Sequence, residues 1–143
     1  MTFVSSHKVR FAHIDAAGIV FYPRYFELLN AAIEDYFAKA VGVDFAAMHV
    51  TRKLGVPLVK LESQFIAPSR LGDDLDFVVQ VESVGRRSAG FWVEVRCGDE
   101  LRFSARLVLV CMDLVSGQST PWPLDMRPVI DAAAPADGAA SLL

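Results

Sequence analysis

Residues 23–41 read PRYFELLNAAIEDYFAKAV, and this stretch decides the fold. Pro23 suits the first position of an α-helix, and Gly42 suits a helix end. Apolar side chains recur between them at steps of three and four residues: Phe26, Leu29, Ile33, Tyr36 or Phe37, and Ala40. Only a narrow polar stripe interrupts them, formed by Glu27, Asn30 and Glu34. A helix that is apolar over most of its circumference is expected to be buried on most sides.

Five other segments alternate apolar and polar side chains, which is typical of strands in a half-buried sheet. They span residues 4–15, 59–67, 74–82, 91–97 and 101–111. A tight turn at 97–100 and a looser one at 85–90 favour antiparallel neighbours. The simplest arrangement is an α+β fold in which a curved antiparallel sheet of about five strands wraps around one long central helix.

The last of these strands predicts an oligomer. Beyond Arg106 it is apolar on both faces, because Val108, Val110 and Met112 join the outer face. We therefore expect another subunit to cover the outer side of the sheet, in a homodimer or homotetramer. Trp122, between two prolines, is expected to cover an edge or an interface.

Composition narrows the class of protein. The 143 residues suit one domain, expected over 1–130, followed by a flexible tail at 131–143 with nothing large to bury. A net charge of −3 argues against a nucleic-acid partner. No apolar run approaches the roughly 20 residues of a membrane-spanning helix, and no targeting signal is visible. We expect a soluble, cytoplasmic protein without a membrane partner, in which Cys97 and Cys111 are reduced thiols.

Several catalytic motifs are absent from the sequence. It contains no G-x-S-x-G elbow, no G-x-x-x-x-G-K-[ST] phosphate loop and no H-E-x-x-H. The histidines at positions 7, 13 and 49 do not show metal-ligand spacing. We therefore expect neither a metal nor an organic cofactor.

The segment HIDAAGIVFYPRYF, residues 13–26, could carry chemistry. Asp15 follows a strand, and a turn containing Gly18 leads to the helix start, where no side chain of the favoured capping kind precedes Pro23. Backbone N–H groups near Tyr22 therefore lack acceptors, and a substrate carbonyl oxygen there would meet an oxyanion site in outline. A nearby carboxylate could attack that carbonyl or activate water. Taken alone, however, an isolated aspartate in this position is more often a turn-former, so both readings stay open.

The run DAAGIVFYPRY, residues 15–25, resembles the signature of the 4-hydroxybenzoyl-CoA thioesterase family, which has the hotdog fold. The resemblance implies hydrolysis of an acyl-CoA thioester, an aromatic acyl group being one candidate, to the free acid and coenzyme A. It makes Asp15 the nucleophile or general base, and it makes the Tyr22 backbone N–H the group that polarises the thioester carbonyl. Coenzyme A enters only as part of the substrate.

The same resemblance implies further site residues. Substrate contacts are expected from Gly18, Tyr25, Asn30, Gly55 and Val56. The spacing of His13, two residues before Asp15, puts both on one face if the strand continues that far, so His13 either tunes Asp15 or contacts substrate, or is an edge-strand histidine that faces solvent. Because the family's active site lies between subunits, Gly55 and Val56 are expected to act from the partner chain. Arg86, Arg87 and Ser88 are expected to hold the phosphates of coenzyme A, although a solvated turn is the common meaning of paired arginines.

Two departures from the family pattern concern the substrate. Similar aromatic-CoA enzymes carry acids at the places of Asn30 and His13, so 4-hydroxybenzoyl specificity does not follow, although Asn30 can still bond a substrate hydroxyl. Pro23 stands where the Tol–Pal-associated branch has a histidine, which points away from that branch. Two rival hypotheses stay open: a non-catalytic hotdog protein that binds acyl-CoA or acyl carrier protein, and a structural subunit.

Overall fold

A computed structural model describes residues 2–135 of the chain. Helix α1 spans Tyr22–Asp35 and continues through a wider helical turn, Tyr36–Val41. It ends at Gly42, which adopts the left-handed conformation, with φ of 87°, that a helix end often requires. The helix predicted over residues 23–41 and its glycine stop are both confirmed.

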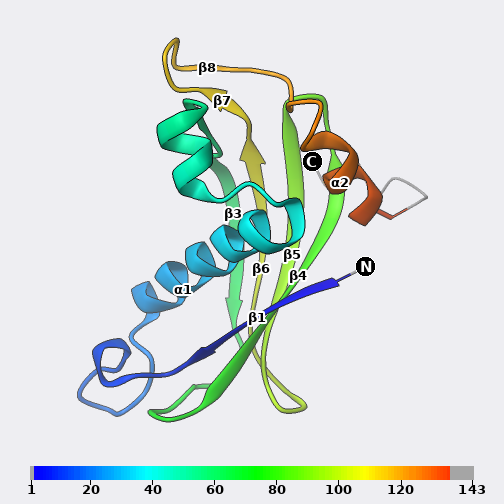
Figure 1. Cartoon of the computed structure of the whole chain (residues 1–143). Coiled ribbons are helices and arrows are strands. Elements are labelled where there is room, and N and C mark those ends of the chain that lie inside the picture. Colours follow the sequence, from blue (N-terminus) through cyan, green and yellow to red (C-terminus); the bar gives the residue numbers. More distant parts are fainter. Residues whose placement is uncertain (1, 136–143) are drawn as a thin grey trace.

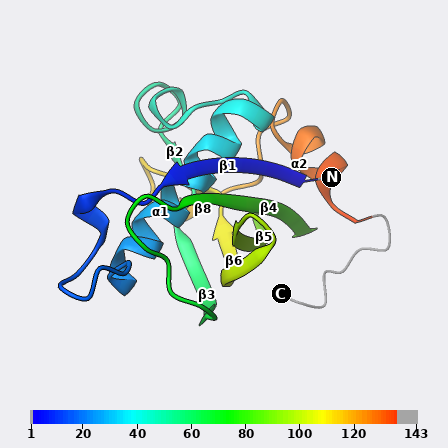
Figure 2. The same ribbon diagram turned by 90° about the horizontal axis from the view of Figure 1, so that it is seen from below.

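The main sheet has five strands, and all neighbours are antiparallel. Its strands are β1 Thr2–Lys8, β4 Asp74–Val84, β5 Ser88–Cys97, β6 Glu100–Val110 and β3 Leu58–Phe65, in that spatial order. Figure 1 shows α1 crossing one face of this sheet, and Figure 2 shows β3 turned away from β1 and β4 by the twist of the sheet. The α+β hotdog architecture predicted from the sequence is confirmed.

Smaller elements surround this arrangement. A second, short sheet contains β2 Leu54–Gly55, β7 Met112–Asp113 and β8 Gln118–Ser119. Helix α2 spans Arg127–Ala133, so the first residues of the predicted tail are helical. Residues 136–143 of that tail lie outside the described residues, and their flexibility stays a prediction. No helix within residues 2–135 is long and apolar enough to cross a membrane.

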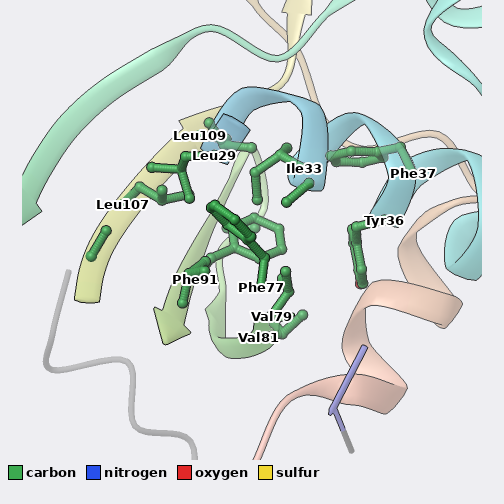
Figure 3. Packing of buried hydrophobic residues seen from close by; sticks show 14 of the residues in the cluster. Leu29, Ile33, Tyr36, Phe37, Phe77, Val79, Val81, Phe91, Leu107 and Leu109 are labelled. Carbon is green, nitrogen blue, oxygen red and sulfur yellow. The ribbon is translucent and has the colours of Figure 1, made fainter. Parts of the chain in front are cut away.

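The core lies between α1 and the inner face of the sheet. Leu29 and Ile33 of α1 point at large side chains of the sheet such as Phe77 and Phe91 (Figure 3). Alternate residues of three central strands are almost completely buried: Leu75, Phe77, Val79 and Val81 of β4, Ala89, Phe91, Val93 and Val95 of β5, and Phe103, Ala105, Leu107 and Leu109 of β6. These are the positions that the period-two pattern assigns to one face.

The first strand is shorter than predicted. It was expected over residues 4–15, but β1 ends at Lys8, and Phe11–His13 form a single 3-10 turn. Local hydrogen bonds replace the strand ladder here: the His13 N–H donates to the Arg10 carbonyl (2.9 Å), and the Arg10 N–H donates to His13 Nδ1 (2.9 Å). Phe11 is 81% exposed, so the alternation that suggested a strand does not mark a buried face.

The outer face of the sheet is polar around Arg106, whereas an apolar outer face was predicted only beyond that residue. Arg106 donates to Glu82 (3.0 Å) and lies over the Trp92 ring, 5.0 Å from its centroid. Val108 and Val110 are only half-buried there. Exposed apolar side chains instead accompany the free edge strand β3: Leu58, Val59, Phe65 and the following Ile66 are 47–59% exposed.

Trp122 is buried at one end of the central strand β5, instead of at the predicted edge of the sheet. Its indole N–H donates to the Ser88 carbonyl at the start of β5 (2.9 Å), and its ring stacks near Phe37. Cys97 and Cys111 are both free thiols, and burial raises the pKa of Cys111 to about 11.

Candidate active site

Asp15 sits at the first position of a tight turn. The Asp15 N–H donates to the Ile19 carbonyl (2.9 Å), and the Gly18 N–H donates to the Asp15 carbonyl (3.0 Å). Gly18 has φ of 78°, a conformation that glycine adopts without strain. One carboxylate oxygen of Asp15 accepts the Ala17 N–H (2.8 Å), whereas the other forms no hydrogen bond within residues 2–135. Asp15 is therefore a turn-former through one oxygen and exposes a second one to solvent.

The start of α1 lies directly beside this turn. The Phe21 N–H donates to the His13 carbonyl (2.9 Å), and Ile14 pairs with Val20 across the turn. No side chain caps the helix, Pro23 has no N–H, and the Tyr22 N–H forms no hydrogen bond within the described part of the chain. An unpaired N–H at the positive end of a helix suits a developing oxyanion.

His13 does not pair with Asp15 as two residues on one strand face would. Its Nδ1 accepts the Arg10 N–H (2.9 Å), so a neutral His13 ring carries its proton on Nε2. No hydrogen bond joins His13 to Asp15 within residues 2–135. His13 is half-buried and acts on the turn through its carbonyl, which holds Phe21.

Tyr25 is buried behind the turn instead of facing an open site. It is 4% exposed, its ring stacks on Phe103, and its hydroxyl donates to Ser69 Oγ (2.8 Å). Ser69 Oγ also accepts from Arg102 (3.2 Å), which bonds Asp73 (2.8 Å). Burial raises the pKa of Tyr25, and the Arg70 N–H, followed by Arg102, lowers the pKa of the Asp73 carboxyl.

This buried network supports the Asp15 turn through backbone contacts. The Ser69 carbonyl accepts the Val20 N–H (2.9 Å), and Ile19 pairs with Arg70. Tyr25 is therefore placed to position the turn, whereas direct contact with substrate, as expected from the family pattern, would require its buried ring to move.

Aromatic side chains form the surface next to the helix start. Phe65 at the end of β3 contacts the rings of Tyr22, Tyr25, Phe26 and Phe103, with ring centroids 5.1–6.4 Å apart. Phe21, Tyr22 and Phe65 are 44%, 61% and 52% exposed. An acyl group bound at the Tyr22 N–H would meet this aromatic surface.

A cavity of about 470 Å³ opens farther along α1. Its wall includes three residues predicted to bind substrate: Asn30, Gly55 and Val56. The other lining residues are mostly large and apolar: Phe26, Leu29, Ile33, Phe45, Pro57, Leu58, Leu61, Leu107, Leu109, Met112 and Leu114, together with His49. Its volume falls in the range of about 300–1,000 Å³ that is common for sites of small organic ligands. Asp15 and Tyr22 do not line it.

Sequence reasoning missed His49 as a site residue. It belongs to the helical turn Ala46–Thr51, a segment without the regular apolar spacing that predicts an element. In the sequence, His49 is a single histidine in an otherwise apolar stretch. Such histidines are too common to identify a binding site.

Arg86, Arg87 and Ser88 lie at the other end of the sheet from Asp15. The eleven residues of β4 separate their turn from the Asp73 end, an extended distance of about 35 Å. Arg86 and Arg87 are exposed, and Arg87 donates weakly to Ser119 (3.3 and 3.4 Å). One chain therefore does not bring these residues to Asp15.

A serine, a histidine and an aspartate also meet outside this region. Ser5 Oγ donates to Asp35 (2.6 Å) and lies 2.7 Å from His7 Nε2. The single hydroxyl proton goes to Asp35, so His7 cannot act as base toward Ser5 in this arrangement, and the group is not a nucleophilic triad. Within residues 2–135, no three His, Cys, Asp or Glu side chains gather as a metal site.

Comparison with protein families adds a decisive observation. The family model described as "Thioesterase-like superfamily" matches residues 9–133, which include the Asp15 turn, α1 and all strands from β2 onward. This chain belongs to the thioesterase-like superfamily. The predicted enzyme class, a thioester hydrolase of the hotdog type, is confirmed.

Curated relatives agree with this assignment. The chain is 31% identical over 111 residues to a 4-hydroxybenzoyl-CoA thioesterase from Pseudomonas sp., covering 68% of this chain and 79% of that protein. It is 26% identical over 118 residues to a 1,4-dihydroxy-2-naphthoyl-CoA hydrolase from Synechococcus elongatus, covering 80% of this chain and 85% of the relative.

Solved structures show the same fold. A 1,4-dihydroxy-2-naphthoyl-CoA thioesterase from Synechocystis matches with a TM-score of 0.82 at 21% identity, covering 92% of this chain and 96% of that one. A thioesterase superfamily protein from Jannaschia sp. matches with a TM-score of 0.87 at 21% identity, covering 94% of each chain.

Proposed function

We propose that this chain hydrolyses an acyl-CoA thioester to the free acid and coenzyme A, with an aromatic acyl group as the preferred class. The observation that carries the proposal is that Asp15 lies in the turn that leads to the start of α1. One of its carboxylate oxygens and the Tyr22 N–H at that helix start form no hydrogen bond within residues 2–135. The named relatives support coenzyme A as the carrier, because their printed activities are all on aryl-CoA thioesters. The aromatic surface at Phe65 and Tyr22 supports the acyl class.

Each group has a defined role in the proposed reaction. The Tyr22 N–H donates to the thioester carbonyl oxygen and stabilises the negative charge that develops on it. Asp15 acts in one of two ways. As a general base it takes a proton from water, which attacks the carbonyl and expels the coenzyme A thiolate. As a nucleophile it forms a mixed anhydride with loss of the thiolate, and water then hydrolyses the anhydride.

We further propose that the working site lies between two subunits of a homodimer. The free edge of β3, with its exposed apolar side chains, is the natural place for a second copy to pair. An antiparallel pair with a two-fold axis near the middle of β3 puts Phe65 of one chain beside Leu58 of the partner subunit. Phe65 contacts Tyr22, and Leu58 lines the cavity. The Asp15 turn of one subunit thus meets the cavity of the other.

This assembly accounts for the scattered positions of the predicted binding residues. Asn30, Gly55 and Val56 line the cavity and contact the acyl group from the partner side. His13 and Gly18 shape the Asp15 turn. Arg86, Arg87 and Ser88 remain the proposed ligands of the coenzyme A phosphates, and they serve this site from a neighbouring subunit. A homotetramer built from such dimers is compatible with the same site.

The proposal is tested by measuring free-thiol release from a panel of aryl and aliphatic acyl-CoAs, with the oligomeric state determined by light scattering. We expect turnover that is highest for aryl-CoAs, by a dimer or tetramer. A folded oligomer that is stabilised by acyl-CoA but releases no thiol would overturn the proposal in favour of the binding protein, since ligand binding alone raises the unfolding temperature.

A further inference from the structure

We propose that His49 is a specificity-determining residue, whose Nε2 accepts a hydrogen bond from a hydroxyl at the far end of the acyl group. The inference rests on the proposed function, because it assigns the cavity beside α1 to the acyl group. Its starting point is the composition of the cavity wall: among its lining residues, only His49 and Asn30 carry polar side-chain groups.

The hydrogen bonding of the His49 ring fixes which nitrogen can accept. Nδ1 lies 2.9 Å from the Phe45 carbonyl oxygen, one helical turn earlier. A carbonyl only accepts, so Nδ1 must carry the proton, and Nε2 of the neutral ring is left as a lone-pair acceptor. No hydrogen bond to Nε2 is formed within residues 2–135. The Phe45 ring, 4.8 Å away between centroids, packs against the imidazole and helps hold its orientation.

The position of Nε2 follows from its neighbour Gly55. A β-carbon built on Gly55 would lie 3.7 Å from His49 Nε2 and 2.9 Å from Leu114 Cδ2. Gly55, His49 and Leu114 all line the cavity, so Nε2 lies close to a part of the wall where Gly55 contributes no side chain. A side chain at position 55 would crowd this part of the wall.

An acceptor in an apolar cavity discriminates between ligands. A wholly apolar acyl group that fills the cavity removes water from Nε2 and leaves this acceptor without a hydrogen bond. An acyl group with a hydroxyl at that place donates a hydrogen bond that replaces the one from water. Asn30, on the α1 side of the same wall, adds an amide that can donate or accept. The matching substrate class is a hydroxylated acyl group, aromatic in the proposed function, with the hydroxyl remote from the thioester.

The test compares substrates that differ by one hydroxyl. Thiol release is measured at one fixed pH for benzoyl-CoA against 4-hydroxybenzoyl-CoA, and for 2-naphthoyl-CoA against 6-hydroxy-2-naphthoyl-CoA. We expect the wild type to prefer the hydroxylated member of at least one pair by about tenfold in kcat/KM, the factor typical of one hydrogen bond. His49→Leu should lose that preference, measured as the ratio of kcat/KM between the two members of a pair. His49→Gln, which retains an acceptor, should keep part of the preference.

The outcomes separate the inference from the function on which it rests. A wild type that turns over both members of each pair equally, or a His49→Leu variant with an undiminished preference, would overturn the role of His49 and leave the thioesterase standing. Thiol release from none of the substrates would overturn the proposed function itself. Unchanged unfolding temperatures of the two variants show that a lost preference is not a loss of fold.

Discussion

The hydroxyl of Tyr25 in α1 donates a 2.8 Å hydrogen bond to Ser69 Oγ, in the connection between β3 and β4. The carbonyl of the same serine accepts a hydrogen bond from the Val20 N–H. One buried residue, Ser69, therefore links the central helix to the turn that carries Asp15. Because Arg102 joins Ser69 to Asp73, this connection is fixed on the sheet side as well. The helix start and the Asp15 turn are thus anchored to one buried point.

Replacement of Tyr25 by phenylalanine should therefore cost stability. The variant loses one buried hydrogen bond between neutral groups and keeps the stacked ring, so we expect the free energy of unfolding to fall by about 1 kcal/mol. Urea unfolding measures the change. Tyr22→Phe is the matched control, since the Tyr22 side chain is 61% exposed and its hydroxyl bonds no described residue. Equal stabilities of the two variants would contradict the anchoring role.

Gly18 should be replaceable by asparagine more easily than by alanine. Its φ of 78° costs an alanine about 1–2 kcal/mol, whereas asparagine tolerates this region better. Space does not interfere, because nothing lies within 4 Å of a β-carbon built there. We expect Gly18→Ala to lower both the unfolding free energy and the rate of thiol release, and Gly18→Asn to lower them less. Two variants of equal stability would show that backbone strain is not the controlling factor.

Stability should fall in mild acid because of His7. Burial lowers the pKa of His7 below 6.5, despite the opposing effect of Asp35. The unfolded chain therefore binds a proton at this site at higher pH than the folded chain does, so the free energy of unfolding decreases as the pH falls below about 6.5 toward the lowered value. His7→Gln, which can still donate to Ser5, should flatten this part of the pH profile. An identical profile for wild type and variant would rule out His7 as the cause.

Mixing two inactive variants tests whether the site lies between subunits. Asp15→Asn removes the carboxylate from the turn, and Val56→Arg fills the cavity with a charged side chain. A mixed dimer then contains one site with both defects and one intact site. Random assembly makes half of the dimers mixed, so about a quarter of the wild-type activity should return after the two variants are unfolded and refolded together. Each variant refolded alone is the control, and a mixture that stays inactive would place the whole site within one chain.

Much of the fold was predictable because its strands are half-buried. Phe77, Phe91 and Phe103 each lie in an alternating run whose inner positions are buried in the structure, and the run at Phe26–Val41 has helical spacing. The prediction failed at residues 9–15, where Phe11 and His13 alternate like strand residues but local bonds to Arg10 form a turn. Short-range hydrogen bonding of this kind leaves no trace in a hydrophobic pattern.

The site was predictable only where a contiguous motif carries it. Asp15 and the Tyr22 N–H are close in sequence, and their juxtaposition follows from a short turn at a helix start. The cavity instead combines residues from α1, β3, β6, the 45–57 segment and the 112–114 segment. No sequence signal therefore joined His49 to Met112. Arg86 and Arg87 lie far from Asp15 because β4 is eleven residues long. The length of a strand can be read from the sequence, but it does not show which end of the sheet binds substrate.

The most direct test of the central claim is the rate of thiol release by Asp15→Asn, measured on the best acyl-CoA substrate. Asparagine keeps the oxygen that accepts the Ala17 N–H, so the turn is retained while the carboxylate is lost. Asp44→Asn is the matched control, because Asp44 makes the same kind of local bond, to the Ala47 N–H (2.7 Å), away from the Asp15 turn. We predict that Asp15→Asn lowers kcat by about 10²–10⁴-fold while Asp44→Asn stays near wild type. Full activity of Asp15→Asn would contradict the account, because it would leave Asp15 as a turn-former alone.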